Sequence, residues 1–234
     1  MNDILICGDP HGNFKSILHA VESNNPKAIV MLGDYDLKKP LDTYLKPVID
    51  AGVEIHWIAG NHDFDNEQYC ENLFSSQLKP FDLNLKVIDI CGTRIAGLAG
   101  IFKGKFWHPD TEPKFKNKKD WLLRQPSNIK KSVNKRGFPL IIKKAIWFDE
   151  VEQMKKKIRA DILVSHEAPS CHKHGFSVID ELAKAIGAQQ IFHGHHHEYY
   201  QDKLSNGINV VGVNIESVCN LQGIHLEGPH EQST

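Results

Sequence analysis

The chain has 234 residues, with 28 Lys or Arg against 29 Asp or Glu, so its formal charge is −1. A composition of 41% hydrophobic and 24% charged residues excludes an intrinsically disordered chain, and no stretch approaches the roughly 20 apolar residues that a membrane-spanning helix needs. Five cysteines without a CxxC pair and the absence of a signal peptide predict a cytoplasmic protein without a disulfide framework.

The first part of the chain alternates apolar runs with amphipathic segments. Nearly continuous apolar runs at residues 4–7, 28–32 and 55–59 are typical of strands that are buried on both faces. Apolar residues at helical spacing follow Asn13, a candidate N-cap, and recur over residues 41–49. This strand–helix–strand alternation predicts parallel pairing with right-handed crossovers.

Shorter apolar runs continue the pattern in the second part of the chain. After about residue 82 they lie closer together and are separated by glycine-containing turns, which favours antiparallel hairpins. A helix is expected over residues 149–158. The predicted class is therefore α/β, with helices flanking two sheets or one mixed sheet. The further strands are expected at residues 87–90, 95–98, 162–164, 191–192 and 210–213.

Residues 103–148 interrupt this alternation, with scattered aromatic residues, four prolines and no clean period. Between Lys103 and Lys144 there are 13 basic and 3 acidic residues, a local charge of +10 that the rest of the chain offsets with −11. Two interpretations stay open: a cap that attracts a nucleotide or nucleic acid, or a solvated lysine-rich loop. We expect a single domain over residues 1–234 with this basic insertion, and the oligomeric state is left open.

Five short polar motifs follow predicted strands. Because ligands bind outside the carboxyl ends of the strands in open α/β sheets, these motifs are expected to converge. In Asp-x-His and His-x-His, two side chains share one side of an extended backbone. The motifs are Asp9-Pro10-His11, Gly33-Asp34, Gly60-Asn61-His62-Asp63, Ser165-His166 and Gly194-His195-His196-His197.

These side chains have the chemistry of metal ligands. Carboxylate, amide and imidazole groups together suit Mn²⁺, Fe or Zn²⁺ better than Ca²⁺, and the absence of nearby cysteine argues against a structural zinc site. Seven candidate ligands are too many for one ion and suit two ions that share a carboxylate. Two divalent transition-metal ions are therefore expected, Mn²⁺ first among them, with Fe, Zn²⁺ or Ni²⁺ as alternatives.

In this order, the five motifs resemble those of the calcineurin-like metallophosphoesterase superfamily: D-x-H, G-D, G-N-H-[DE], a lone H and G-H-x-H. They span residues 9–197, which is most of the chain. The resemblance implies a four-layer α/β/β/α sandwich. It also implies hydrolysis of a phosphate mono- or diester by in-line attack of a metal-bridging hydroxide, without a phosphoenzyme.

The resemblance also implies a role for each site residue. It places one metal on Asp9, His11, Asp34 and His197, and a second on Asp34, Asn61, His166 and His195, with Asp34 bridging. His62 would be the acid that protonates the leaving group. Asp36 and Asp63 are both candidates to orient His62, and Asp63 is counted with it as catalytic.

The sequence departs from the protein phosphatase branch of the family, which carries G-D-x-[VY]-D-R-G. Here the second motif continues as Tyr35-Asp36-Leu37-Lys38, without the Arg-Gly pair. A non-catalytic binding module on the same fold would be expected to lose metal ligands or His62, and all are present. A phosphoesterase acting on a nucleotide or nucleic-acid-derived phosphate is the leading prediction; the binding module and the protein phosphatase are the alternatives.

Overall fold

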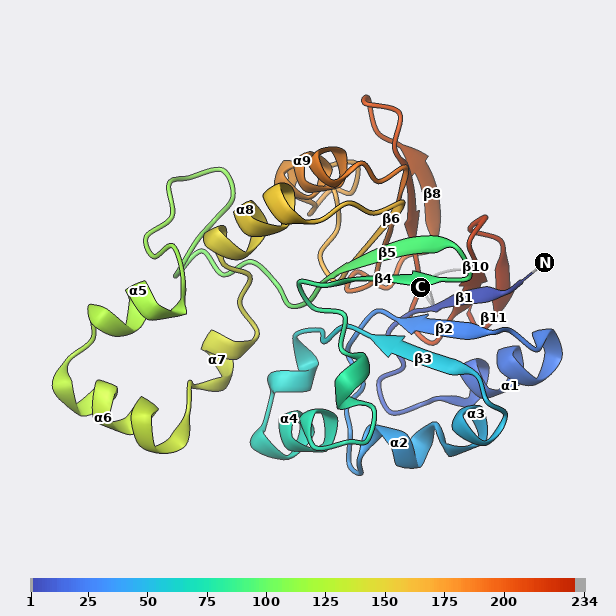
Figure 1. Ribbon diagram of the computed structural model, residues 1–234, viewed down its shortest axis with the longest axis horizontal. Coiled ribbons are helices and arrows are strands. Elements are labelled where there is room, and N and C mark those ends of the chain that lie inside the picture. The colour runs from blue at the N-terminus through green and yellow to red at the C-terminus, as the bar shows by residue number, and fades with distance from the viewer. Residues whose placement is uncertain (1, 230–234) are drawn as a thin grey trace.

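Two β-sheets pack face to face, and helices cover the outer face of each (Figure 1). The computed structural model describes residues 2–229, so Met1 and residues 230–234 of the predicted domain lie outside the described part. The layers therefore run helix, sheet, sheet, helix, which confirms the predicted α/β sandwich.

The first sheet has the order β11-β10-β1-β2-β3, and β1, β2 and β3 run parallel. Its helical cover comes from the crossovers between these strands and from the segment after β3. The strands are β1 (Ile4–Cys7), β2 (Ala28–Met31), β3 (Glu54–Trp57), β10 (Val218–Asn220) and β11 (His225–Glu227); the helices are α1 (Lys15–Asn24), α2 (Leu41–Tyr44), α3 (Lys46–Asp50) and α4 (Glu67–Phe74), and the 3-10 turns are η1 (His62–Phe64) and η2 (Lys79–Phe81).

The second sheet has the order β4-β5-β6-β7-β9-β8. The expectation of antiparallel hairpins holds for β4–β5 and β8–β9, but it is wrong for β5, β6, β7 and β9, which pair in parallel. Helical segments connect β5 to β6 and β6 to β7, and the edge strand β8 lies between β7 and β9 in the chain. Its elements are β4 (Val87–Ile90), β5 (Thr93–Leu98), β6 (Ile162–Ser165), β7 (Gln190–His193), β8 (Tyr200–Lys203), β9 (Asn209–Gly212), α8 (Phe148–Lys157) and α9 (Ser177–Ile186).

Side-chain alternation in the central strands explains how one strand serves two interfaces. In β1, Ile4 and Ile6 face the second sheet, while Leu5 and Cys7 pack against the helices. All four are buried, as the continuous apolar run predicts. The core between the sheets therefore ties the two parallel sets of strands into one scaffold, which fixes the loops at their carboxyl ends.

Two predicted helix boundaries change for local reasons. The helical pattern over residues 41–49 divides into α2 and α3, because Pro47 lacks the N–H that a continuous helix would use and lies in the first turn of α3. Helix α1 begins at Lys15, and Asn13 accepts a 3.3 Å hydrogen bond from the Lys15 backbone N–H without being the N-cap residue.

Residues 103–148 contain three short helices, α5 (Lys118–Leu123), α6 (Ser127–Arg136) and α7 (Leu140–Lys143), where the sequence predicted no regular structure. They project from the sandwich between β5 and α8 (Figure 1). Phe106 and Trp147 stack with ring centroids 5.0 Å apart inside a small apolar cluster of this segment. Aromatic anchors, not a helical apolar stripe, therefore hold the segment together. No helix in the described part has the length and apolar character needed to cross a membrane.

Candidate metal centre

The predicted side chains meet at the carboxyl ends of the parallel strands. The polar loops follow β1, β2 and β3 in the first sheet and β6 and β7 in the second. Hydrogen bonds from backbone N–H groups link the loops: His11 N–H donates to the Asp34 carbonyl oxygen over 3.0 Å, and His195 N–H donates to the Asp9 side chain at Oδ2 over 2.6 Å. Motifs from opposite ends of the chain thus form one cluster.

One group of candidate ligands consists of Asp9, His11 and His197. One ligand atom from each lies within 4.8 Å of the others. Nε2 of His11 is 3.1 Å from Nε2 of His197, and Nε2 of His197 is 3.6 Å from Asp9 Oδ2. Two imidazole nitrogens that face each other beside a buried carboxylate are suited to share one cation.

A second group consists of Asp34, His166 and His195, again with ligand atoms within 4.8 Å of one another. Nε2 of His166 lies 3.2 Å from Asp34 Oδ2 and 3.2 Å from Asn61 Oδ1. Asp34 Oδ2 also lies 3.9 Å from His11 Nε2 in the first group. Asp34 therefore stands between the two groups, as expected of a bridging carboxylate.

The hydrogen bonds around these residues leave metal-binding atoms available. Asp9 Oδ1 is buried and has no hydrogen bond, which in a folded protein calls for a bound partner. Nδ1 of His166 donates to Leu32 O over 2.8 Å, so in the neutral ring Nε2 keeps its electron pair and points toward Asp34 and Asn61. This donor set fits two divalent cations.

Burial and mutual charge shift the pKa values of these groups strongly. Burial raises the pKa of Asp9 to about 8. Burial favours the neutral ring of His166, but the charges of Asp34 and Asp9 outweigh it and raise its pKa to about 10. Burial lowers the pKa of His195 to about 3, which keeps that ring neutral. In the absence of metal, these shifts favour the protonated forms of Asp9 and His166 and the unprotonated ring of His195.

The backbone at four candidate ligands is left-handed. His11, Asp34, His195 and His197 have φ angles of 41°, 53°, 73° and 53°. Residues with a Cβ rarely adopt this region, and each instance costs on the order of 1–3 kcal/mol. The fold holds this strain at the residues whose side chains meet at the centre.

Glycine is required beside the cluster because the backbone approaches it closely. A Cβ atom on Gly60 would lie 2.2 Å from Asp34 Oδ1, and one on Gly194 would lie 2.3 Å from Asp9 Oδ1. Both distances are far below van der Waals contact. The glycines in the third and fifth motifs therefore make room for the candidate ligands.

His62 lies at the exposed side of the centre, with 44% of its side chain accessible. Its backbone N–H donates to Asp34 Oδ1 over 2.7 Å, and its ring centroid is 5.3 Å from that of His11. Nδ1 of the ring lies 2.6 Å from Asp65 Oδ2, and Lys144 Nζ is 3.5 Å from the other oxygen of Asp65. His62 is thus accessible to solvent, and Asp65 engages Nδ1 of its ring.

The carboxylate beside His62 is neither of the two that the sequence suggested. Asp36 pairs with His11, with 3.0 Å between Oδ2 and Nδ1. Asp63 is fully buried and accepts three backbone N–H groups, from Asp34, Tyr35 and Gly60, so it holds the turn and does not face the centre. The partner of His62 is Asp65, which the sequence interpretation missed; the two residues lie three positions apart, across the 3-10 turn η1.

Other histidines pack beside the centre without joining either group. The ring of His196 stacks on that of His172 with centroids 4.0 Å apart, and His193 Nε2 lies 2.6 Å from the hydroxyl oxygen of Tyr200. Glu167, also missed, is buried, accepts a 2.8 Å hydrogen bond from Phe102 N–H, and has its pKa raised to about 7 by burial. One ligand atom each of Glu167, His195 and His196 also lies within 4.8 Å of the others, so these side chains form a further candidate group that shares His195 with the second one.

Several known proteins resemble this chain in sequence or in fold. A protein of Haemophilus influenzae without assigned function is 32% identical over 225 residues, which cover 95% of this chain and 96% of the relative. The crystal structure of TT1561 from Thermus thermophilus superposes with a TM-score of 0.59 at 15% identity, covering 96% of this chain and 97% of the other. A dimetal phosphatase from Danio rerio has a TM-score of 0.52 at 14% identity, with 94% and 93% of the two chains covered.

A 5'-nucleotidase from Candida albicans also shares the fold, with a TM-score of 0.50 at 14% identity; the match covers 93% of this chain and 47% of that one. The family model for calcineurin-like phosphoesterases matches residues 3–199, which include all five motifs. The chain therefore belongs to the calcineurin-like phosphoesterase family and is a metal-dependent phosphoesterase.

Proposed function

We propose that the protein hydrolyses a phosphate mono- or diester at a dinuclear metal centre. Asp9, His11, Asp34 and His197 would hold one cation, and Asp34, Asn61, His166 and His195 the other. The observation that carries this proposal is the position of Asp34 Oδ2, 3.2 Å from Nε2 of His166 and 3.9 Å from Nε2 of His11. Bound metals would activate water and neutralise charge on the phosphoryl group.

The residues of the chain supply the remaining functions. Asp65 fixes the ring of His62 through Nδ1, which leaves Nε2 to give a proton to the leaving-group oxygen. Asp34 in turn positions the backbone of His62, because Asp34 Oδ1 accepts a hydrogen bond from the His62 N–H. Asp63 keeps the turn in shape, because its carboxylate binds backbone on both sides of the site.

The preferred metal is proposed to be Mn²⁺, with Fe, Zn²⁺ or Ni²⁺ as alternatives. The donors are carboxylate oxygen, amide oxygen and imidazole nitrogen, and no thiolate belongs to either group. This mixture suits intermediate divalent cations. The substrate is proposed to be a nucleotide or a nucleic-acid-derived ester, because the segment of charge +10 projects beside this edge of the sandwich (Figure 1).

Metal content and turnover should be measured on the same preparation. Protein saturated with Mn²⁺ and then desalted is expected to retain close to two ions per chain and to hydrolyse p-nitrophenyl phosphate, bis-p-nitrophenyl phosphate or both. Asp34→Asn should lower both the stoichiometry and the turnover. Tight binding of a single ion per chain, or full turnover in Asp34→Asn, would contradict a bridged dinuclear centre.

A further inference from the structure

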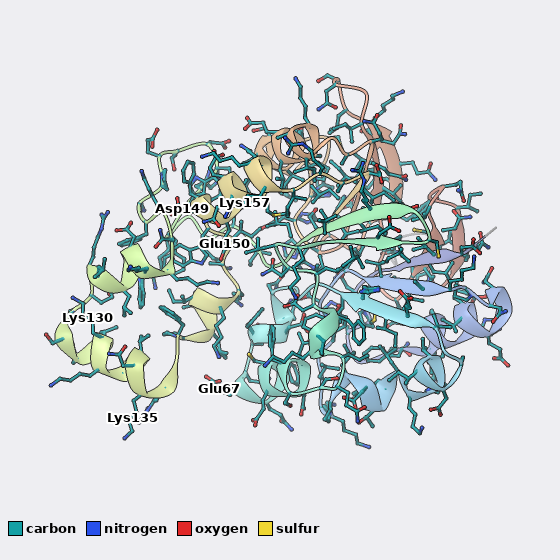
Figure 2. The ribbon with its side chains drawn as sticks, viewed as in Figure 1. Glu67, Lys130, Lys135, Asp149, Glu150 and Lys157 are labelled. Carbon is teal, nitrogen blue, oxygen red and sulfur yellow. The ribbon has the colours of Figure 1, made fainter. Side chains whose placement is uncertain are left out.

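A cavity of about 660 Å³ lies between α4 and the segment 103–148. This volume is within the range of about 300–1,000 Å³ that is usual for small-molecule sites. Figure 2 labels Glu67 on α4 and Glu150 at the start of α8, two elements that border this space. None of the candidate metal ligands lines it.

Aromatic rings form the apolar part of the lining. Phe64 is the last residue of η1, Phe74 is the last residue of α4, and Phe138 comes from the loop before α7. Phe64 and Phe74 also contact each other, with ring centroids 5.8 Å apart. Phenyl rings from both the body and the projecting segment give the cavity an aromatic lining, which suits a flat aromatic ligand.

The charged part of the lining is mainly acidic, with four carboxylates and two lysines. Lys118 is paired with Glu150 over 3.2 Å, and Lys143 Nζ lies 3.9 Å from Cys70 Sγ. Glu67 and Glu71 occupy successive turns of α4, and both are exposed toward solvent. The cavity therefore offers more hydrogen-bond acceptors than donors, and a ligand that carries N–H donors would satisfy them.

We propose that this cavity is a binding site for an aromatic base that carries an exocyclic amine. The aromatic ring would stack on the phenyl groups, and the amine would donate to the α4 carboxylates, as the amine of cytosine donates to Asp or Glu in base recognition. A base with a carbonyl group in place of the amine would place a hydrogen-bond acceptor beside the carboxylates, which are also acceptors, and would therefore bind less tightly.

The cavity borders η1, the turn that carries His62. Lys143 and Ala145 line the cavity, and the intervening Lys144 places Nζ 3.4 Å from Asn61 O and 3.5 Å from Asp65 Oδ1. An occupant would thus contact residues on both sides of Lys144, which holds Asp65, the partner of His62. The base can belong to a nucleotide substrate or to a separate ligand, and the two have the same chemistry.

Cytidine and uridine form a matched pair of probes because they differ in the amine and carbonyl at one ring position. Isothermal titration of the Mn²⁺-loaded protein is expected to give at least about tenfold tighter binding of cytidine, equivalent to roughly 1.4 kcal/mol. Glu67→Gln and Glu71→Gln should each reduce this preference, since they alter exposed acceptors without touching the core. Phe138→Ala should weaken the binding of both nucleosides by about tenfold or more.

Two further variants locate the binding. Lys130→Ala lies on the same projecting segment but outside the lining and should bind cytidine as the unmodified protein does. Asp34→Asn should lose turnover but retain cytidine binding, so a failed metal mechanism is distinguishable from a failed cavity assignment. Equal binding of the two nucleosides, no binding of either, or binding that Asp34→Asn abolishes and Phe138→Ala spares would overturn the proposal.

Steady-state kinetics with p-nitrophenyl phosphate separates the two sources of the base. Competitive inhibition by cytidine indicates that the cavity receives the base of a substrate. A change in kcat without competition indicates a separate ligand that acts through the Lys144 contact. Both results require the cavity to bind the base, and neither should be seen in the Phe138→Ala variant.

Discussion

His62 and Asp65 form a hydrogen-bonded pair in which Nδ1 of the imidazole lies 2.6 Å from Oδ2 of the carboxylate. The pair spans one 3-10 turn, so a short piece of backbone sets both the position of the ring and its tautomer. Since Nδ1 is engaged by Asp65, Nε2 is the nitrogen left for the proton transfer that we propose.

Replacing His62 should separate chemistry from metal binding. His62→Asn is expected to keep the metal content and to lower turnover by roughly 10²–10⁴-fold, the range for a general acid or base. Asp65→Asn should cause a smaller loss, of about 10–100-fold, because the ring stays but loses its orientation. Turnover and bound metal should be measured on the same samples. His108→Asn is a matched control, since His108 also faces an aspartate, Asp110, at 3.6 Å, but in the projecting segment. Unchanged turnover in His62→Asn would remove it from the mechanism.

Asp63 is expected to matter for stability more than for proton transfer. Asp63→Ala would leave three buried backbone N–H groups without an acceptor, so the free energy of unfolding should fall by at least about 3 kcal/mol. Asp63→Asn should lose less, because its amide oxygen can still accept the two bonds made by Oδ2. Urea denaturation of the metal-free proteins tests this order. The exposed Asp110→Ala variant is the control, and equal stability of Asp63→Ala and the unmodified protein would contradict the assignment.

Metal binding is expected to release protons. Without metal, Asp9 with its pKa near 8 and His166 with its pKa near 10 both hold protons at pH 7. Ligation requires both groups to be deprotonated, so bound metal displaces about one to two protons and the apparent affinity rises as pH increases from 6 to 8. Calorimetric titration with Mn²⁺ in two buffers of different ionisation enthalpy measures the number released. Identical observed enthalpies in the two buffers would show that no proton leaves.

The basic segment gives a prediction about salt dependence. If α6 contacts a polyanion, replacing its four basic residues with Gln should reduce the slope of log K against log salt by about 0.7 for each phosphate that the variant no longer neutralises. Fluorescence anisotropy with a short single-stranded DNA measures this slope. Four exposed lysines on the body, replaced together, provide a charge-matched control. An unchanged slope in the α6 variant would favour a solvated segment. The α6 residues are Lys130, Lys131, Lys135 and Arg136, and the control residues are Lys15, Lys27, Lys79 and Lys86.

The strand scaffold could be predicted because its signal is local. Continuous apolar runs identify β1, β2 and β6, and polar residues directly after them mark the carboxyl ends. The strand β8 reads Tyr-Gln-Asp-Lys and is mostly exposed, so it has no apolar pattern from which to predict it. Pairing with β9 alone makes it a strand, and such pairing is a tertiary effect.

The residue types of the candidate site could be predicted, but the hydrogen-bond partners of its side chains could be predicted less well. Strand-end motifs identify Asp9, His166 and the other candidate ligands, because only side-chain chemistry and spacing are needed. The separate roles of Asp63 and Asp65 depend on the direction in which a 3-10 turn aims each side chain, and residue types alone do not give it. The helices of residues 118–143 escaped prediction because scattered aromatic anchors replace a periodic apolar face.

The left-handed backbone at His11, Asp34, His195 and His197 means that selection for chemistry and selection for folding oppose each other at these positions. Glycine would relax each of them by about 1 kcal/mol or more while removing a candidate ligand. A descendant of this chain that no longer needed catalysis would therefore be expected to drift toward glycine or asparagine there and to become more stable as it did so. Retention of histidine at such positions in a relative would mark continued selection for the reaction.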